Sequence, residues 1–346
     1  MTETTTHQTP PTPSASMRAS FARDEIMRVL DQYSTGAVHS VREMIAGSSE
    51  APKVVVECER GKLLLKRRAR GLEHAVLVGF AHEVILGCLE QGVCVPPLIG
   101  TTAGNNSMCQ MVDQTYELFV FIDGAVFDQS IEHARQSGML LGELHRCMDS
   151  ITTTFEPTTE SVVVNPQRVD GFEFSDAETD RIRRVLEYGL DAHRANARPN
   201  AIVHGDWHPG NMIFSGPEII AICDFDNCRI GSRDRELAQA LVYLSMKRPA
   251  PGNPIPNEAS MDHLLAVWDG YCAQSGTHPN PKLIGALMPA VLLDEAFASA
   301  GTGAGSGTGE GSAGHIQPNP LVQAAIKKSI WLDEHNPEII RSLEQR

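Results

Sequence analysis

The amino-acid sequence predicts an α+β fold with a strand-rich N-terminal part and a mostly helical C-terminal part. Short apolar strand patterns gather before Asp123-Gly124, whereas helical periodicity dominates after it. The chain is also long enough, at 346 residues with 42% apolar side chains, for about two units by a ~150-residue prior. We therefore expect an N-terminal part over 18–123 and a C-terminal part over 124–346.

The N-terminal part is predicted to contain two helices and five strands. Residues 20–34 place apolar side chains at helical spacing, and a longer helical pattern over 72–91 stops at Gly92. The predicted order is helix, three strands, helix and two strands. Short apolar runs separated by turn residues predict the strands, at 38–45, 53–58, 62–66, 107–112 and 117–122.

Helices account for most of the C-terminal part. One of them opens with a capping box, in which Ser175 precedes Glu178 by three residues. The uncharged apolar run over 283–293 is shorter than the ~20 residues of a membrane span, so we expect a buried helix there. Helical patterns cover 129–148, 176–195, 234–247, 261–274, 281–298 and 320–334.

Two segments have the composition of flexible chain. Residues 1–17 are rich in Thr, Pro and Ser and lack apolar periodicity, so we expect a disordered tail. This tail has no basic start followed by an apolar core, as a secretory signal would have. Half of the residues in 301–314 are glycine, which is typical of a flexible linker.

Charge and cysteine content restrict the classes of partner. The chain has 29 Lys+Arg against 43 Asp+Glu, a net charge of −14, which argues against a sequence-independent nucleic-acid binder because phosphates need a basic surface. Cationic or neutral partners are weakly favoured, and no membrane partner is expected. The eight cysteines are irregularly spaced and form no C-x-x-C pair, so we expect reduced thiols and a cytoplasmic location.

The segment over 201–226, AIVHGDWHPGNMIFSGPEIIAICDFD, carries the residues for chemistry. A short strand leads into a loop, and two apolar runs joined by turn residues then form a hairpin. Asn211 stands before the first hairpin strand and Asp224 after the second, so the hairpin should place them side by side, close to Asp206. Magnesium prefers such oxygen ligands and takes its remaining ligands from waters and phosphates.

The spacing of these residues matches a kinase catalytic loop. In kinases an Asp is followed after four residues by an Asn, and a later D-F-G supplies a metal-binding Asp. Asp206, Asn211 and Asp224 fit this spacing, with Asp226 in place of the glycine. Only residues 225–233 precede the next acidic helix start, which leaves no room for an activation loop, so a protein kinase is disfavoured.

A metal-dependent hydrolase is an alternative. His204, Asp206 and His208 alternate, so on a strand they would share one face and could bind zinc or iron. However, Gly205 and Pro209-Gly210 favour a loop over a strand.

The HGDWHPGN and DFD segments resemble the hallmark motifs of the aminoglycoside phosphotransferase and choline kinase-like family. The resemblance covers about residues 20–345 in element order and is specific over 201–238. It implies a two-lobed protein-kinase-like fold, with a small antiparallel-sheet N-terminal lobe and a mostly helical C-terminal lobe. It further implies an ATP- and Mg²⁺-dependent phosphotransferase acting on a hydroxyl of a small molecule, such as an aminoglycoside, choline or homoserine.

The resemblance also assigns roles by position. Asp206 would be the catalytic base that accepts the substrate hydroxyl proton, and Asn211 and Asp224 would be the magnesium ligands. Among four supporting residues, His204 would pack near Asp224 and His208 would organise the loop. Asp226 would close the DFD motif, and Asp234 would open the next helix and brace the catalytic loop.

A kinase of this type holds the α/β-phosphates with a strand lysine that is paired to a helix glutamate. Lys66 is the best candidate for the lysine, and Glu83 is the expected partner. The competing residues are Lys62, Arg67 and Arg68 for the cation and Glu73 and Glu90 for the acid.

The remaining nucleotide contacts are expected in two loops. The phosphate-covering loop would be 46–50 with Ser48, although it has one glycine and lacks G-x-G-x-x-G. The hinge beside the adenine would fall near 117–122, with Glu117 and Phe119.

Two questions about the activity stay open. A non-catalytic nucleotide-binding pseudokinase is an alternative, because the covering loop is short of glycine and the phosphate lysine has competitors. Acidic side chains on the C-terminal helices could receive a cationic acceptor or could form solvated faces; they are Asp262, Asp269, Asp294 and Glu295.

Overall fold

A computed structural model describes the chain except for residues 1–17, 46, 157–158, 160–162, 248–255 and 303–315. The tail predicted over 1–17 and residues 303–314 of the predicted linker lie outside the described residues. Residues 301–302 end a helix.

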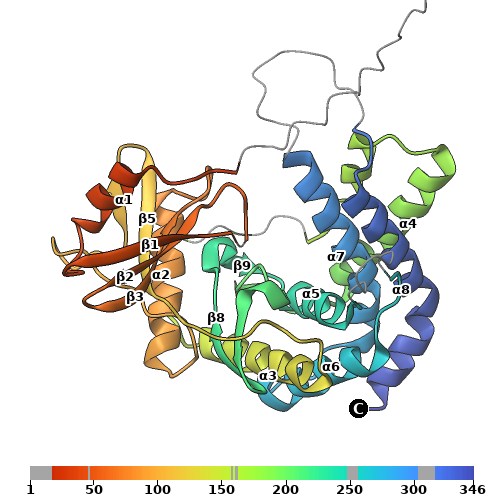
Figure 1. The fold of residues 1–346 in the computed structure, drawn as a ribbon. Helices are drawn as coiled ribbons and strands as arrows, with labels where there is room; N and C mark the ends of the chain where they lie inside the picture. Colours follow the sequence, from red (N-terminus) through yellow and green to blue (C-terminus); the bar gives the residue numbers. More distant parts are fainter. Residues whose placement is uncertain (1–17, 46, 157–158, 160–162, 248–255, 303–315) are drawn as a thin grey trace, which may run out of the picture.

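The N-terminal part is a five-stranded antiparallel sheet with two helices (Figure 1). The strands run in the order β1-β2-β3-β5-β4, and helix α1 packs on the sheet through Ile26, Val29 and Leu30 against Val56 and Leu65. Alternating side chains point to opposite faces of a strand, so apolar residues two apart build this core. The elements are α1 (Arg23–Leu30), β1 (Val38–Met44), β2 (Lys53–Cys58), β3 (Gly61–Arg67), α2 (Ala75–Glu90), β4 (Cys109–Met111) and β5 (Gln114–Val120).

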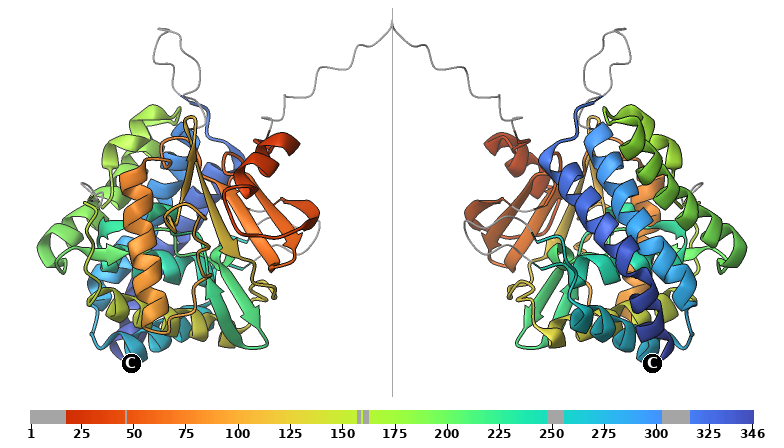
Figure 2. Two further views of the ribbon diagram at one scale, coloured as in Figure 1. Left: turned by 90° about the vertical axis from the view of Figure 1, so that its left-hand side faces the viewer. Right: turned by 90° about the vertical axis from the view of Figure 1, so that its right-hand side faces the viewer.

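The C-terminal part is mostly helical and lies on the other side of the molecule in Figure 1; in the left view of Figure 2, α2 stands in front of it. Helices α3 and α6 approach closely at two glycines, since a Cβ on Gly138 or Gly270 would meet backbone oxygens of the other helix at 2.1 and 2.3 Å. The helices are α3 (Ile131–Met148), α4 (Asp176–Asn196), α5 (Arg233–Ser245), α6 (Met261–Ser275), α7 (Pro281–Thr302) and α8 (Pro320–Glu344).

Helix α7 is the buried helix that the sequence predicts. Its segment Pro281–Ala300 is long and apolar enough to cross a membrane, yet 72% of the most apolar window is buried inside the protein, as in a core helix. Leu283, Leu287 and Val291 are at most 1% exposed. The helix therefore buries its apolar side chains against neighbouring helices.

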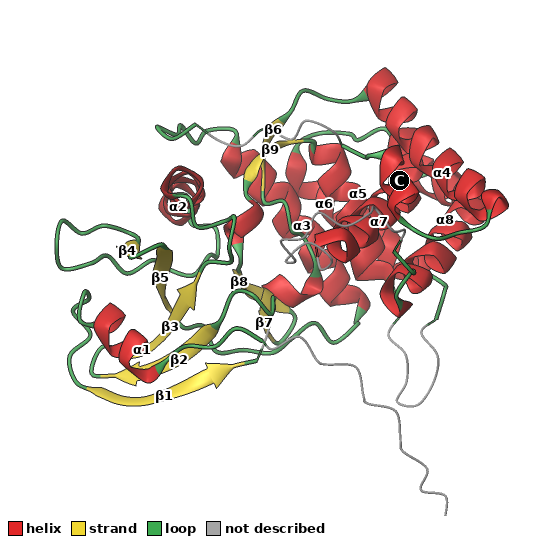
Figure 3. Cartoon of the chain, turned by 90° about the horizontal axis from the view of Figure 1, so that it is seen from above, coloured by secondary structure: helices red, strands yellow, loops and turns green. Residues whose placement is uncertain are grey.

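Two small strand pairs lie between the sheet and the helices (Figure 3). One is the predicted hairpin, β7 (Met212–Ser215) with β8 (Glu218–Ile222). The other pairs β6 (Ala201–Val203) with β9 (Arg229–Gly231), and β9 is a strand that the sequence pattern did not predict. The two pairs enclose the loop and the turn that carry the candidate site.

The predicted elements and the α+β fold class are confirmed, and most boundaries agree within about three residues. The largest difference is α8, which continues ten residues beyond the predicted end at 334 and contains Pro337. The expected capping box at Ser175 and Glu178 is present.

Candidate active site

The catalytic loop joins β6 to the β7–β8 hairpin and holds Asp206 and Asn211 together. The Asn211 amide nitrogen Nδ2 donates to the Asp206 carbonyl oxygen at 2.9 Å and to the Asp206 carboxylate at 3.1 Å. At the end of the hairpin, the Cys223 backbone N–H donates to the Asn211 carbonyl at 2.8 Å, so Asp224 follows directly beside Asn211. The predicted convergence of Asp206, Asn211 and Asp224 is therefore present in the structure.

Asp206 is held ionised by its neighbours. Burial raises its pKa, but the hydrogen bond and charge of His208 and the hydrogen bond from Asn211 outweigh burial, so the pKa of Asp206 lies below its usual value. Burial also acts on His208, whose pKa is nevertheless raised because its Nε2 lies 3.4 Å from the Asp206 carboxylate. The structure thus places His208 beside the proposed base.

His204 is completely buried under the loop. Its Nε2 donates to the Cys223 carbonyl at 3.0 Å, and its Nδ1 accepts the Asp206 backbone N–H at 3.2 Å. The ring also packs at right angles on Trp207 and tilted on Phe225. His204 therefore ties the base to the residue before Asp224.

The hydrolase alternative does not fit this arrangement. Both ring nitrogens of His204 are engaged by backbone groups, and residues 204–208 lie on a loop. Within the described residues, no group of three His, Cys, Asp or Glu side chains is placed to hold a metal ion. The loop that Gly205 and Pro209-Gly210 predict is present, and the alternative in which His204, Asp206 and His208 share a strand face is wrong.

Helix α5 braces the catalytic loop, but through a residue that the sequence analysis missed. Glu236 accepts hydrogen bonds from the backbone N–H groups of His204 and Gly205 and from His145 Nε2 at 2.7 Å. Burial raises the pKa of Glu236, but the hydrogen bond and charge of His145 outweigh it and lower the pKa to about 2. Gln239 extends this face, because its side-chain oxygen accepts the backbone N–H of Trp207 at 3.1 Å.

The bracing role predicted for Asp234 is therefore wrong. Asp234 instead accepts hydrogen bonds from the Arg198 side chain at 2.8 Å and from the Arg198 backbone N–H at 3.2 Å. Helix residues that are two positions apart in sequence point about 200° apart around the axis, so Asp234 and Glu236 face opposite sides of α5. Glu236 and Gln239 share a face at i,i+3 spacing, and this spacing was the available signal.

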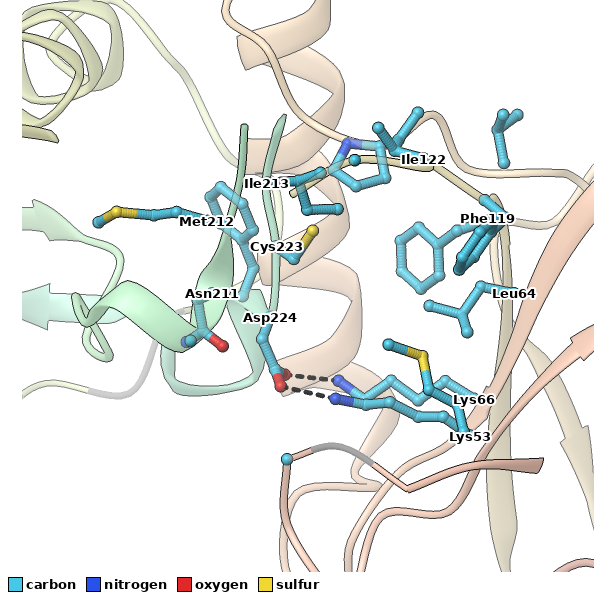
Figure 4. A pocket seen from close by; sticks show the side chains of 18 of the residues that line it. Lys53, Leu64, Lys66, Phe119, Ile122, Asn211, Met212, Ile213, Cys223 and Asp224 are labelled. Carbon is cyan, nitrogen blue, oxygen red and sulfur yellow. Dashed lines mark hydrogen bonds and ion pairs between the residues drawn. The ribbon is translucent and has the colours of Figure 1, made fainter. Parts of the chain in front are cut away.

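On the nucleotide side, two lysines from adjacent strands meet Asp224 (Figure 4). Lys66 Nζ lies 2.7 Å from Asp224 Oδ1, and Lys53 Nζ lies 2.9 Å from Asp224 Oδ2. Lys66 also pairs with Asp226. Burial lowers the pKa of Lys66, but the negative charges of Asp224, Asp226 and Glu117 raise it above its usual value, so Lys66 is charged. Lys53 was not among the predicted candidates.

The predicted pair of Lys66 with Glu83 is wrong. Glu83 accepts hydrogen bonds from the backbone N–H groups of Thr154 and Phe155, at 2.7 and 3.2 Å. The preceding residue of α2, His82, faces the sheet instead and binds Glu117 through Nε2 at 2.6 Å. Successive side chains of a helix point about 100° apart around its axis. His82 therefore meets the sheet, whereas Glu83 points elsewhere.

Glu117 and Arg68 form a buried pair behind the two lysines. Arg68 donates to both Glu117 oxygens at 2.7 Å and lies 3.0 Å from Asp226. Burial raises the pKa of Glu117, but the charges of Arg68 and Lys66 and the hydrogen bond from His82 lower it well below the usual value. The side chains of Arg68 and Glu117 are each 1% exposed.

These groups border a cavity of about 270 Å³ between the sheet and the hairpin. Glu117 and Phe119 line it, as do Asn211 and Asp224. In the expected covering loop, Gly47 lines the cavity, whereas the exposed Ser48 accepts a hydrogen bond from the Glu50 N–H at 3.1 Å. A nucleotide contact of Ser48 stays a prediction.

The acidic residues on α7 are not a solvated face. Asp294 is 4% exposed and pairs with Arg168 at 2.8 Å. Glu295 accepts the Tyr243 hydroxyl at 2.8 Å and pairs with Arg235 at 3.1 Å. Both carboxylates are therefore matched by side chains of the protein itself.

Comparisons with known proteins place this arrangement among phosphotransferases. The model of the "Phosphotransferase enzyme family" matches residues 42–273. No curated protein sequence matches the chain. An amicoumacin kinase solved with AMP-PNP, Ca²⁺ and amicoumacin is 14% identical, with a TM-score of 0.65 over 93% of this chain and 94% of that one.

Two further solved structures share the fold. A microcompartment-associated aminopropanol kinase is 15% identical, with a TM-score of 0.65 over 93% of this chain and 98% of that chain. An aminoglycoside phosphotransferase from Alicyclobacillus acidocaldarius is 16% identical, with a TM-score of 0.60 over 98% and 97%. The fold is therefore that of the protein-kinase-like small-molecule kinases, as the resemblance implied.

Proposed function

The chain belongs to the phosphotransferase enzyme family, and from that premise we propose that it transfers the γ-phosphoryl group of ATP to a hydroxyl of a small molecule in a Mg²⁺-dependent reaction. One observation carries the proposal: Asp206, Asn211 and Asp224 converge at one end of a hairpin that faces two buried lysines. The two metal ligands and the two lysines thus line one cavity, and the base Asp206 is hydrogen-bonded to the metal ligand Asn211.

The donor set fits magnesium. Asn211 directs its amide nitrogen at Asp206, which leaves its Oδ1 as the atom for a metal, and Asp224 adds a carboxylate on the neighbouring strand end. Oxygen donors of this kind, completed by waters and phosphates, are the usual magnesium environment. When bound, the ion would neutralise charge on the phosphate oxygens.

Asp206 would orient the acceptor hydroxyl and take its proton. Its lowered pKa keeps the carboxylate ionised at neutral pH, and Asn211 and His208 fix its direction. Phosphoryl transfer needs mainly positioning and electrostatic stabilisation, so a weak but well-placed base is sufficient.

The acceptor is proposed to be a small molecule. Between Asp224 and α5, the chain is occupied by a short turn at Phe225–Asn227 and by β9, so an activation segment has no space there.

The test is transfer of radiolabelled γ-phosphate from ATP to a panel of neutral and amine-bearing hydroxyl compounds, with and without Mg²⁺. Once an acceptor is found, Asp206→Asn should lower the single-turnover rate roughly a hundredfold or more. Circular dichroism and thermal unfolding would verify that the variant folds. A wild-type rate in the folded variant would refute the role of Asp206, and a wild type inactive on every acceptor would favour a pseudokinase.

A further inference from the structure

Lys53 is a buried cation whose individual role the proposed function does not distinguish from that of Lys66. It is the first residue of β2, and its side chain is 11% exposed. Lysine is almost never buried unless it is paired. The partner of Lys53 is Asp224, 2.9 Å away on the facing hairpin.

Lys53 and Lys66 face each other across neighbouring strands. They are register partners of β2 and β3, and each ammonium group takes one oxygen of Asp224 (Figure 4). Like charges placed opposite each other in a sheet are destabilising, so the shared carboxylate holds this pair together. Both lysines depend on Asp224 for a negative charge, but they do so to different degrees.

The difference appears once Asp224 turns to a metal ion. Lys66 keeps a second carboxylate, Asp226, which is itself bound by Arg68. Asp224 is the one anionic partner that the described residues give to Lys53. Lys53 would then need a new anion in the same place.

The position of Lys53 indicates which anion arrives. A Cβ on Gly47 of the covering loop would lie 3.0 Å from the Lys53 Nζ, so the ammonium group sits directly beneath that loop. In Figure 4, Lys53 and Ile122 of the hinge mark opposite ends of the cavity. A nucleotide with its base at the hinge would extend its phosphates toward Lys53.

We propose that Lys53 binds the terminal phosphate of the nucleoside triphosphate, while Lys66 binds the inner phosphates. The inference rests on the proposed function. It also explains how a covering loop with a single glycine, and so with few closely approaching N–H groups, can hold a triphosphate. In the nucleotide-free protein, Lys53 stays on Asp224.

The test compares the affinities of Mg·AMP-PNP and Mg·ADP by titration calorimetry. Lys53→Met should weaken AMP-PNP binding about tenfold or more, because a charge-assisted contact is lost, and should change ADP binding by less than about threefold. Lys66→Met should weaken both ligands. Lys62→Met is the matched control, since Lys62 lies on the same sheet with a 51% exposed side chain, and it should change neither.

An equal loss of both ligands, or a loss of neither, in Lys53→Met would overturn the proposal. If that variant does not fold, Lys53→Gln keeps a donor beside Asp224 and should show the same selective loss. Wild-type protein that binds no nucleotide would refute the proposed function itself. Wild-type binding with an unselective Lys53→Met would refute the inference alone.

Discussion

The two sides of the cavity are held together over very different lengths of chain. Asp206 is fixed by His204, two residues before it, and by Asn211, five residues after it. Lys66 reaches Asp224 and Asp226 across 158 and 160 residues. The catalytic side is thus a local motif on a short hairpin, whereas the nucleotide side is an ionic network assembled by the whole fold. A substitution in the ionic network should therefore lower mainly the stability of the fold, whereas a substitution on the catalytic side should lower mainly the catalytic rate.

The largest effect is expected from the network. Arg68→Met leaves Glu117 buried without its bidentate partner, so the free energy of unfolding should fall by about 3–5 kcal/mol. Chemical denaturation measures this loss. Adding Glu117→Gln should recover part of it, because the uncompensated charge is removed. Additive losses in the double variant would contradict the network.

On the catalytic side, Glu236→Gln should cost less stability, about 1–3 kcal/mol, because an amide keeps one acceptor oxygen. The loop that carries Asp206 would lose part of its brace, so kcat should fall while the KM for ATP stays near wild type. Asp234→Asn is the control, since Asp234 binds Arg198 and not the loop. Equal effects of the two variants on kcat would argue against the brace.

A smaller effect concerns pH. The folded-state pKa of His208 is raised by Asp206, so the stability from this pair is present below the unfolded pKa of about 6.5 and is lost as pH rises through the folded pKa. Asp206 behaves oppositely: its lowered pKa contributes stability above about 3.8, which is lost as pH falls through the folded value. His208→Gln should therefore move the acidic limb of kcat/KM to higher pH. An unmoved limb would show that His208 does not influence the base.

The smallest effect is expected for Glu83. Its bonds go to Thr154 and Phe155 at the surface and not to Lys66, so Glu83→Ala should leave ATP affinity within about twofold. Stability should change by no more than about 1 kcal/mol. A tenfold loss of ATP affinity would show instead that Glu83 acts at the phosphate site.

The contrast also explains what could be predicted from sequence. Asp206, Asn211 and Asp224 are brought together by a loop and a hairpin whose turn residues are readable in the sequence, so their juxtaposition was predictable. Strand β9 was not, because three residues carry too little periodicity to be distinguished from a loop.

Partners on the nucleotide side could not be predicted. Helix α2 is apolar almost all round, burying Phe80, Ala81, Val84 and Ile85, so its pattern does not say whether His82 or Glu83 meets the sheet. Lys53 was not predicted for a related reason. Its position opposite Lys66 depends on strand register, which no local pattern gives.

Helix α2 belongs to the N-terminal part by its place in the sequence, but it packs with the helices of the C-terminal part. Its apolar side chains, among them Val84 and Cys88, belong to the same core as Leu141 and Leu144 of α3, whereas the sheet and α1 form a separate core. His82 links it by polar contacts to Glu117 of β5 and to Ser107 in the loop before β4. Local opening follows buried apolar contacts, so amide hydrogen exchange should divide the protein into two cooperative units. Helix α2 would then exchange with the helices that follow it, and the sheet would open on its own.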